Sequence, residues 1–160
     1  MSIKSIFVFE NLKPKKIVEV SLVISLFGIA DAIYLTIAHY TQATILACPT
    51  TSFINCDKVT TSSYSEIFGI PVSILGLAFF LALFIIQLPI FWTSKYLWVK
   101  TPRIVFVSIG LISAFWFIYV ELHKLHAICL YCTGIHTLTF LSFITILLAS
   151  ENFQATNKKA

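Results

Sequence analysis

Four long apolar runs alternate with shorter polar or basic segments along the chain. The runs cover residues 17–38, 69–92, 104–122 and 128–149. A helix needs about 20 apolar residues to cross roughly 30 Å of hydrocarbon, so each run is long enough to span a membrane. Within lipid, backbone groups must be bonded inside the segment, which favours helices. The pattern predicts an all-α integral membrane protein, a four-transmembrane-helix bundle in which residues 1–160 form one domain.

The composition excludes an ordinary soluble domain. Hydrophobic residues make up 58% of the chain and charged residues 11%, whereas soluble domains average about 25% charged residues. The mean hydropathy of +0.92 agrees with this. The net charge of +4 does not indicate nucleic-acid binding, because the basic residues form no continuous patch. We expect membrane lipid around the protein and no nucleic-acid partner.

The basic residues are distributed unevenly over the segments between the runs. The loop 39–68 contains one basic residue, Lys58, and the short turn before the fourth run contains one, Lys124. Cytoplasmic loops carry the excess of Lys and Arg, so both termini are predicted in the cytoplasm and the large loop outside. The remaining basic residues all fall on the predicted cytoplasmic side: Lys4, Lys13, Lys15, Lys16, Lys95, Lys100, Arg103, Lys158 and Lys159.

All four cysteines then face the oxidising side of the membrane, where disulfides form and persist. Cys48 and Cys56 lie in the outer loop, and Cys129 and Cys132 open the fourth run. In the first turn of a helix, Cys129 and Cys132 share a face, and the positive end of the helix dipole favours a thiolate. Burial in lipid opposes that charge, and the sequence leaves open which effect is larger. The arrangement predicts thiol–disulfide exchange.

Other interpretations of the cysteines are incidental thiols, static disulfides in a non-catalytic four-span scaffold, or a metal site. A possible ligand ladder recurs every three residues at His123, His126, Cys129 and Cys132. Each step of three turns about −60° around a helix, so the first and fourth residues point in opposite directions. A site formed by the four cysteines lacks the paired C-x-x-C spacing of zinc sites. We therefore expect no metal.

Two stretches together resemble the vitamin K epoxide reductase family, most of all its bacterial members. They are "CPTTSFINCDKVTTSSYSEIFGIPVSILG" at 48–76 and "CLYCTGIH" at 129–136. The shared features are a cysteine pair eight residues apart, a serine six residues after the second cysteine, Phe-Gly-Ile-Pro before the second span, and C-x-x-C at the last span. The resemblance runs from the first span through the fourth.

The resemblance implies a four-helix bundle around a quinone pocket. Cys129 and Cys132 would form the active-site pair, with Cys132 nearest to the quinone. Cys48 would meet a thioredoxin-like partner, and Cys56 would exchange with Cys129. Ser62 would shape the loop over the pocket. The implied activity passes electrons from the reduced partner to a quinone of the ubiquinone or menaquinone type, which supports disulfide formation.

The chain departs from the vertebrate members of the family at two positions. His136 stands where they have a tyrosine, and Ser65 stands where an asparagine binds vitamin K. These differences favour an ordinary quinone over reduction of vitamin K epoxide in the endoplasmic reticulum, which is the alternative. Many bacterial relatives carry a fused thioredoxin domain, whereas this chain ends at Ala160. We expect a separate partner of the DsbA type and a bacterial inner membrane.

Ionisable residues inside the apolar runs are further candidates. His136 lies one turn below Cys132, where it is predicted to donate a hydrogen bond or a proton to the quinone. Its alternative role is a hydrogen bond between helices. Asp31 is ambiguous and is compatible with a simple polar contact. Glu19 and Glu121 lie near span ends and are expected at the interface with water.

Overall fold

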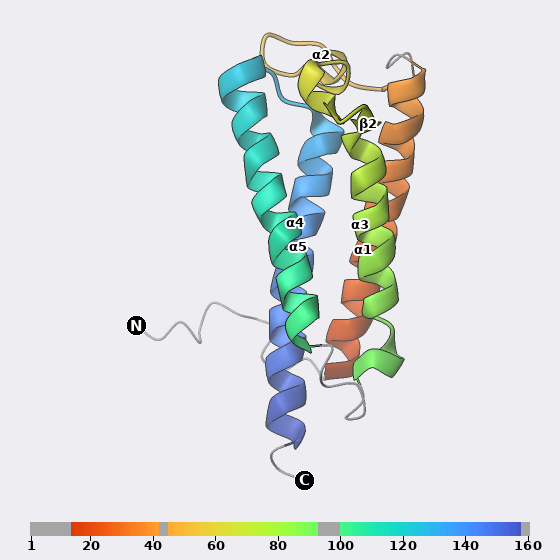
Figure 1. Cartoon of the computed structure of the whole chain (residues 1–160), viewed down its shortest axis with the longest axis vertical. Helices are drawn as coiled ribbons and strands as arrows, with labels where there is room; N and C mark the ends of the chain where they lie inside the picture. The colour runs from red at the N-terminus through yellow and green to blue at the C-terminus, as the bar shows by residue number, and fades with distance from the viewer. Residues whose placement is uncertain (1–13, 42–44, 93–99, 158–160) are drawn as a thin grey trace.

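The computed structural model describes residues 14–41, 45–92 and 100–157. Its longest helices stand side by side in an elongated bundle, and the segment between α1 and α3 folds over one end as a cap (Figure 1). The prediction of a mostly helical membrane fold is therefore confirmed. The helices of the bundle are α1 (Pro14–Tyr40), α3 (Val72–Ile86), α4 (Lys100–Tyr119) and α5 (Leu130–Asn157).

Three stretches of the described chain are long and apolar enough to cross a membrane: Lys15–Tyr40, Lys100–Leu125 and Leu130–Glu151. The second predicted run, 69–92, is helical over a shorter length, because α3 has 15 residues. At 1.5 Å per residue it extends about 22 Å. Pro71 precedes its first turn, and Pro89 opens the separate 3₁₀ turn η4 (Pro89–Trp92). A proline ring cannot continue a helix from the preceding turn, so α3 stops before Pro89.

The helices meet in an apolar core halfway along the bundle. α1 packs against α3 and α5, and α4 packs against α5. Phe80, Val107 and Ile146, from three different helices, are fully buried together. Gly28 of α1 lets the Phe80 ring approach closely, because a Cβ atom on Gly28 would collide with that ring. This contact brings α1 and α3 together.

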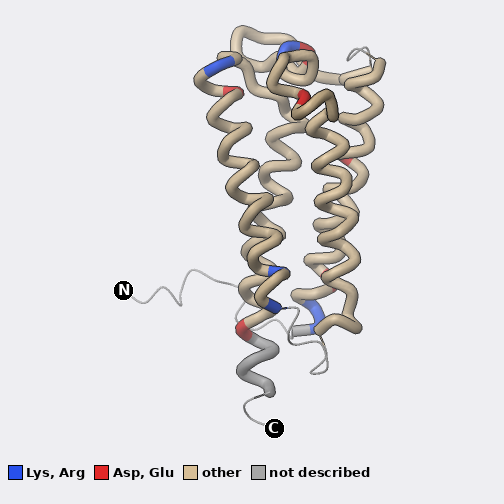
Figure 2. The backbone as a smooth tube through the Cα atoms, viewed as in Figure 1, with Lys and Arg blue, Asp and Glu red and all other residues tan. Residues whose placement is uncertain are grey.

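Most charged residues lie toward the two ends of the bundle, and the shaft between the ends carries few (Figure 2). α1 and α4 begin at the end opposite the cap, so Lys15, Lys16, Lys100 and Arg103 lie there. Along the shaft, large apolar side chains such as Phe27, Ile112 and Trp116 are exposed. Such a surface suits lipid rather than water.

The cap is built from short elements. They are α2 (Cys56–Thr60), the 3₁₀ turn η3 (Ser63–Ser65), and the antiparallel strands β1 (Glu66–Ile67) and β2 (Ile70–Pro71). Phe68 and Gly69 form the hairpin tip with φ of 54° and 77°. Positive φ at both positions is what a two-residue hairpin turn requires. His39 of α1 holds the cap, since its ring lies 3.3 Å from the Thr60 carbonyl and 3.3 Å from the Glu66 carboxylate.

α4 does not end as a regular helix. It continues into the π-helical turn η6 (Val120–Leu125), which stops at His126 in the left-handed conformation with φ of 48°. The Ala127 N–H donates to the Glu121 carbonyl at 3.1 Å and closes the turn. The chain then enters α5 at Leu130, two residues later than the predicted run begins.

Candidate redox site

The loop cysteines are joined in the cap. Cys48 and Cys56 form a disulfide with their Cα atoms 6.1 Å apart. The approach to Cys48 is held by two tyrosines whose ring centroids lie 4.9 Å apart. Tyr34 donates to the Ile45 carbonyl at 2.7 Å, and Tyr131 donates to the Ala47 carbonyl at 3.2 Å. The disulfide is thereby anchored to α1 and α5.

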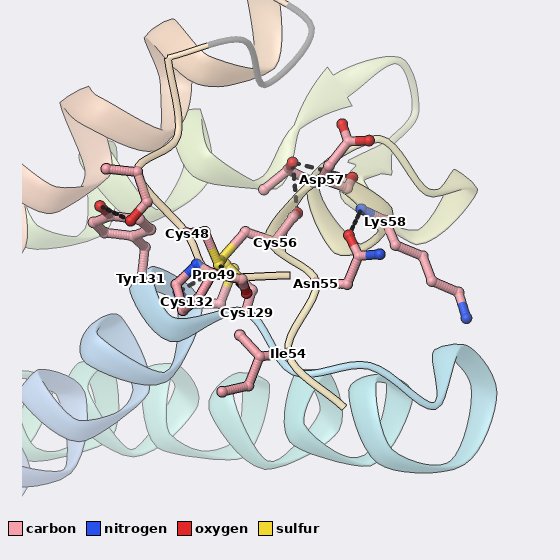
Figure 3. The surroundings of a disulfide bond; sticks show 12 residues. Cys48, Pro49, Ile54, Asn55, Cys56, Asp57, Lys58, Cys129, Tyr131 and Cys132 are labelled. Atoms are coloured by element: carbon pink, nitrogen blue, oxygen red, sulfur yellow. Dashed lines mark hydrogen bonds between the residues drawn. A yellow bond between two sulfur atoms is a disulfide. The ribbon is translucent and has the colours of Figure 1, made fainter. Parts of the chain in front are cut away.

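A short backbone pairing connects the loop to the C-x-x-C segment. Ile54 and Ile128 form an isolated parallel bridge. The Ile128 N–H and carbonyl bond to the loop backbone at 2.7 Å and 3.1 Å. Because the paired segments run in the same direction, Cys56 and Cys129 follow the bridge on neighbouring strands of chain. Both lie in one buried cluster, with Cys48 and Cys132 packed against it (Figure 3).

Cys129 is a helix cap rather than a residue of the first turn. α5 begins at Leu130, and the Cys129 sulfur accepts a hydrogen bond from the Cys132 N–H at 3.3 Å. Both thiols are free. Cys129 lies between two candidate spans, where the hydrogen bond from the Cys132 thiol lowers its pKa and burial works against that shift.

An apolar cavity of about 270 Å³ lies below the cysteines, with walls formed by all four helices and by the cap. Cys132 lines the cavity, whereas Cys129 is not among the lining residues. Phe79 of α3 and Phe106 of α4 also line it and stack with their centroids 5.1 Å apart. The two cysteines of the C-x-x-C therefore differ in position: one faces the loop disulfide and the other faces the cavity.

His136 and Ser62, the two residues predicted at the quinone, also line the cavity. The His136 ring is half-buried, and its Nδ1 has no hydrogen-bond partner among the described residues. An orphaned buried N–H is rarer in proteins than an orphaned acceptor, so we assign the proton to Nε2. Ser62 uses its hydroxyl within the cap, where it donates to the Val59 carbonyl at 2.8 Å. Its hydroxyl is therefore engaged within the cap, and its role at a quinone stays a prediction.

The prediction that Glu121 lies at the interface with water is wrong. Glu121 is only 5% exposed, lines the cavity, and its carboxyl interacts with the backbone of Cys129. An acidic residue within an apolar run is a functional candidate, so this signal was available in the sequence. Ser73 was also missed. It lines the cavity with a buried hydroxyl that lacks a partner among the described residues, and nothing in the sequence marks it.

No group of three or more His, Cys, Asp or Glu residues in the described ranges is arranged to hold a metal ion. The possible ligand ladder, which the sequence argued against, is interrupted because the left-handed backbone at His126 separates η6 from α5. His123 and His126 are exposed, whereas Cys129 is buried. The cysteines therefore lie close to one another, between the cap and the cavity. They do not share their surroundings with these histidines.

A helical membrane bundle with two adjacent cysteine pairs above an apolar cavity has the architecture of a membrane redox protein. The model of the vitamin K epoxide reductase family matches residues 20–147, which is most of the chain. The chain belongs to this family and is a membrane oxidoreductase. The resemblance seen in the sequence is thus confirmed. A comparison with curated proteins found no match.

Proposed function

We propose that this protein takes electrons from a reduced thioredoxin-like protein outside the cytoplasm and passes them to a membrane quinone, thereby supporting disulfide formation. The observation that carries the proposal is the bridge between Ile54 and Ile128. It brings Cys56 beside Cys129 in one buried cluster, while Cys132 lines the cavity. The four sulfurs thus form a path from the outer loop to an apolar chamber.

Electrons would move along this path by thiol–disulfide exchange. A thiolate of the partner attacks the loop disulfide at Cys48, and a second partner thiol resolves the mixed disulfide. The freed Cys56 then attacks Cys129 of the oxidised C-x-x-C pair, and Cys132 leaves as the thiol that faces the cavity. Cys48 restores the loop disulfide by attacking Cys56.

The cavity suits the head ring of a quinone. Its volume of about 270 Å³ is near the small end of ligand pockets, which span about 300–1,000 Å³. The stacked Phe79 and Phe106 rings offer an aromatic wall. On our tautomer assignment, His136 can donate a hydrogen bond from Nε2 to a quinone carbonyl. Ubiquinone and menaquinone both present two carbonyl acceptors, so either type satisfies these contacts.

We infer that all four helices of the bundle cross the membrane with both termini in the cytoplasm. The basic residues at the ends of α1 and α4 opposite the cap support this orientation. α3 is shorter than the other helices, and the turn η4 extends its apolar segment to Trp92. The cysteines then face the periplasm of a bacterium, where a dithiol oxidase would act.

Purified protein in lipid nanodiscs tests the function directly. Reduced thioredoxin-like protein and ubiquinone or menaquinone are added, and quinone absorbance is followed. The wild type should consume quinone in proportion to the disulfide formed in the partner. Cys132→Ser should abolish the reaction, and Cys48→Ala should abolish it with the protein partner. No quinone consumption by wild type with four intact, reducible cysteines would contradict the proposal.

The same assay addresses the family's other substrate. Vitamin K epoxide is offered in place of the quinone, with dithiothreitol as the reductant. Ser65 is buried and donates its hydroxyl hydrogen to the Ser62 carbonyl at 2.7 Å, so it is already engaged within the cap. We therefore expect quinone reduction without epoxide reduction. Faster turnover of the epoxide than of the quinone would favour the alternative activity.

A further inference from the structure

Glu121 is a buried carboxyl group that the electron path does not use. The hydrogen bond from Ala127 to its carbonyl ties its backbone to the segment that leads into the C-x-x-C. Its carboxyl lies next to the backbone of Cys129. It also lines the cavity. π-helical turns such as η6 often occur at functional sites.

Oxidation of a dithiol by a quinone transfers two electrons and two protons. Cys132 lines the cavity and can deliver its own proton there. Cys129 has no exposed surface and does not line the cavity; it is buried in the cluster that contains Cys56. The Cys129 proton therefore needs a carrier group that lies next to Cys129 and also lines the cavity.

We propose that Glu121 is a catalytic residue that carries the Cys129 proton to the quinone. This inference rests on the proposed quinone reduction. The Glu121 carboxylate takes the proton from the Cys129 thiol. The two sulfurs then join in a disulfide, and the two electrons released pass through Cys132 to the quinone. One quinone oxygen receives the Cys132 proton and the other receives the proton from Glu121. A quinol forms, and Glu121 returns to its carboxylate.

Other carboxyl groups in the described ranges do not meet both requirements. Asp31 of α1 acts electrostatically on Cys132 but does not line the cavity. Glu66 belongs to the cap, where its carboxylate pairs with His39. His136 lines the cavity one turn beyond Cys132, on the side away from Cys129, and serves better as a donor to the quinone. Among the carboxyl groups of the described residues, Glu121 both lies next to the Cys129 backbone and lines the cavity.

The test is a single turnover of pre-reduced protein with excess menaquinone, monitored by quinone absorbance. Glu121→Gln keeps an oxygen acceptor for the Cys129 backbone but cannot carry a proton. Proton transfer by a positioned side chain contributes about 10²–10⁴-fold to rates. We expect a loss of at least about 100-fold in the rate of quinol formation. Glu19→Gln, at an exposed position of α1, is the matched control and should react as the wild type does.

Two further measurements separate proton transfer from packing. Menaquinone binding by equilibrium dialysis and reduction of Cys129–Cys132 by dithiothreitol should be unchanged in Glu121→Gln. In Glu121→Ala, added formate should restore part of the lost rate, because a small acid can replace the missing carboxyl. If Glu121→Ala does not fold, the Gln variant decides alone. A wild-type rate in Glu121→Gln, or a slow Ala variant that formate does not accelerate, overturns the proposal. If the wild type itself forms no quinol, the proposed function fails instead.

Discussion

Replacing His136 with phenylalanine would test how the cavity holds its quinone. The variant keeps an aromatic ring at a position that lines the cavity, and it removes both ring nitrogens. In the structure Nδ1 is buried without a hydrogen-bond partner among the described residues. The His136 imidazole nitrogens therefore contribute little to the stability of the fold. We expect them to contribute to quinone binding instead, through a hydrogen bond from Nε2 to a quinone carbonyl.

The magnitude follows from these two roles. A hydrogen bond lost from a buried partner costs about 1–3 kcal/mol, which corresponds to roughly 5- to 150-fold in affinity. The apparent KM for quinone should rise by that factor. The free energy of unfolding without quinone should stay constant or increase, because the substitution removes an unsatisfied buried nitrogen. Weaker quinone binding is thus expected together with undiminished stability, and general damage to the fold cannot produce that combination.

The assay is steady-state quinone reduction with reduced partner, combined with thermal unfolding in detergent. His136→Gln is the control, because its amide can place a donor near the position of Nε2 and should retain most of the affinity. Exchange between the partner and the loop disulfide should be equal in all variants. An unchanged KM in the Phe variant would refute the hydrogen bond and reduce His136 to a packing residue.

Three other outcomes are expected. A maleimide that cannot cross membranes should label reduced Cys48 in intact cells, and labelling only after the cytoplasmic face is opened would reverse the orientation. The lowered pKa of Cys129 means that its thiolate persists to lower pH than that of an ordinary thiol. Cys132→Ala should therefore raise the midpoint pH of the thiolate absorbance. Identical titrations of the variant and the wild type would disprove the hydrogen bond from the Cys132 thiol. Arg103 is buried over Trp92 and donates to the carbonyls of Ile86 and Phe91 at 2.9 Å and 3.2 Å. Arg103→Met should therefore lose about 2–4 kcal/mol of stability in chemical unfolding, more than Arg103→Lys, and an equal stability would show that these bonds contribute nothing.

The helical bundle could be predicted because its signals are local. An apolar run of sufficient length predicts a membrane span without reference to other segments. The orientation predicted from the lysines likewise requires no knowledge of how the helices pack. The spacing of Cys129 and Cys132 likewise marks a dithiol without reference to the rest of the fold. The apolar runs are helical in the structure, although α5 starts at Leu130 and α3 covers only Val72–Ile86 of the second run.

The remainder depends on contacts between distant segments. Cys129 caps α5 because the loop pairs with Ile128, and no local pattern predicts that pairing. Glu121 was expected at the interface with water from its place near a span end. It is buried where η6 packs against α2 of the cap. The environment of Ser73 arises only when α3 faces the cavity between the helices.

The central claim is that electrons pass from Cys56 to Cys129, and trapping that exchange tests it most directly. In the double variant Cys48→Ala with Cys132→Ser, neither resolving thiol remains, so the mixed disulfide between Cys56 and Cys129 should accumulate. Such a bond requires Cα atoms within about 7 Å, which only a loop folded onto the start of α5 allows.

A protease site inserted between residues 93 and 99 separates the loop from α5 after cleavage. The two halves of the double variant should migrate together without reductant and separate once reductant is added. A control that also carries Cys56→Ala should give separate halves in both conditions. Halves of the double variant that separate without reductant, while the wild type still reduces quinone, would mean that electrons take another route and would contradict the account.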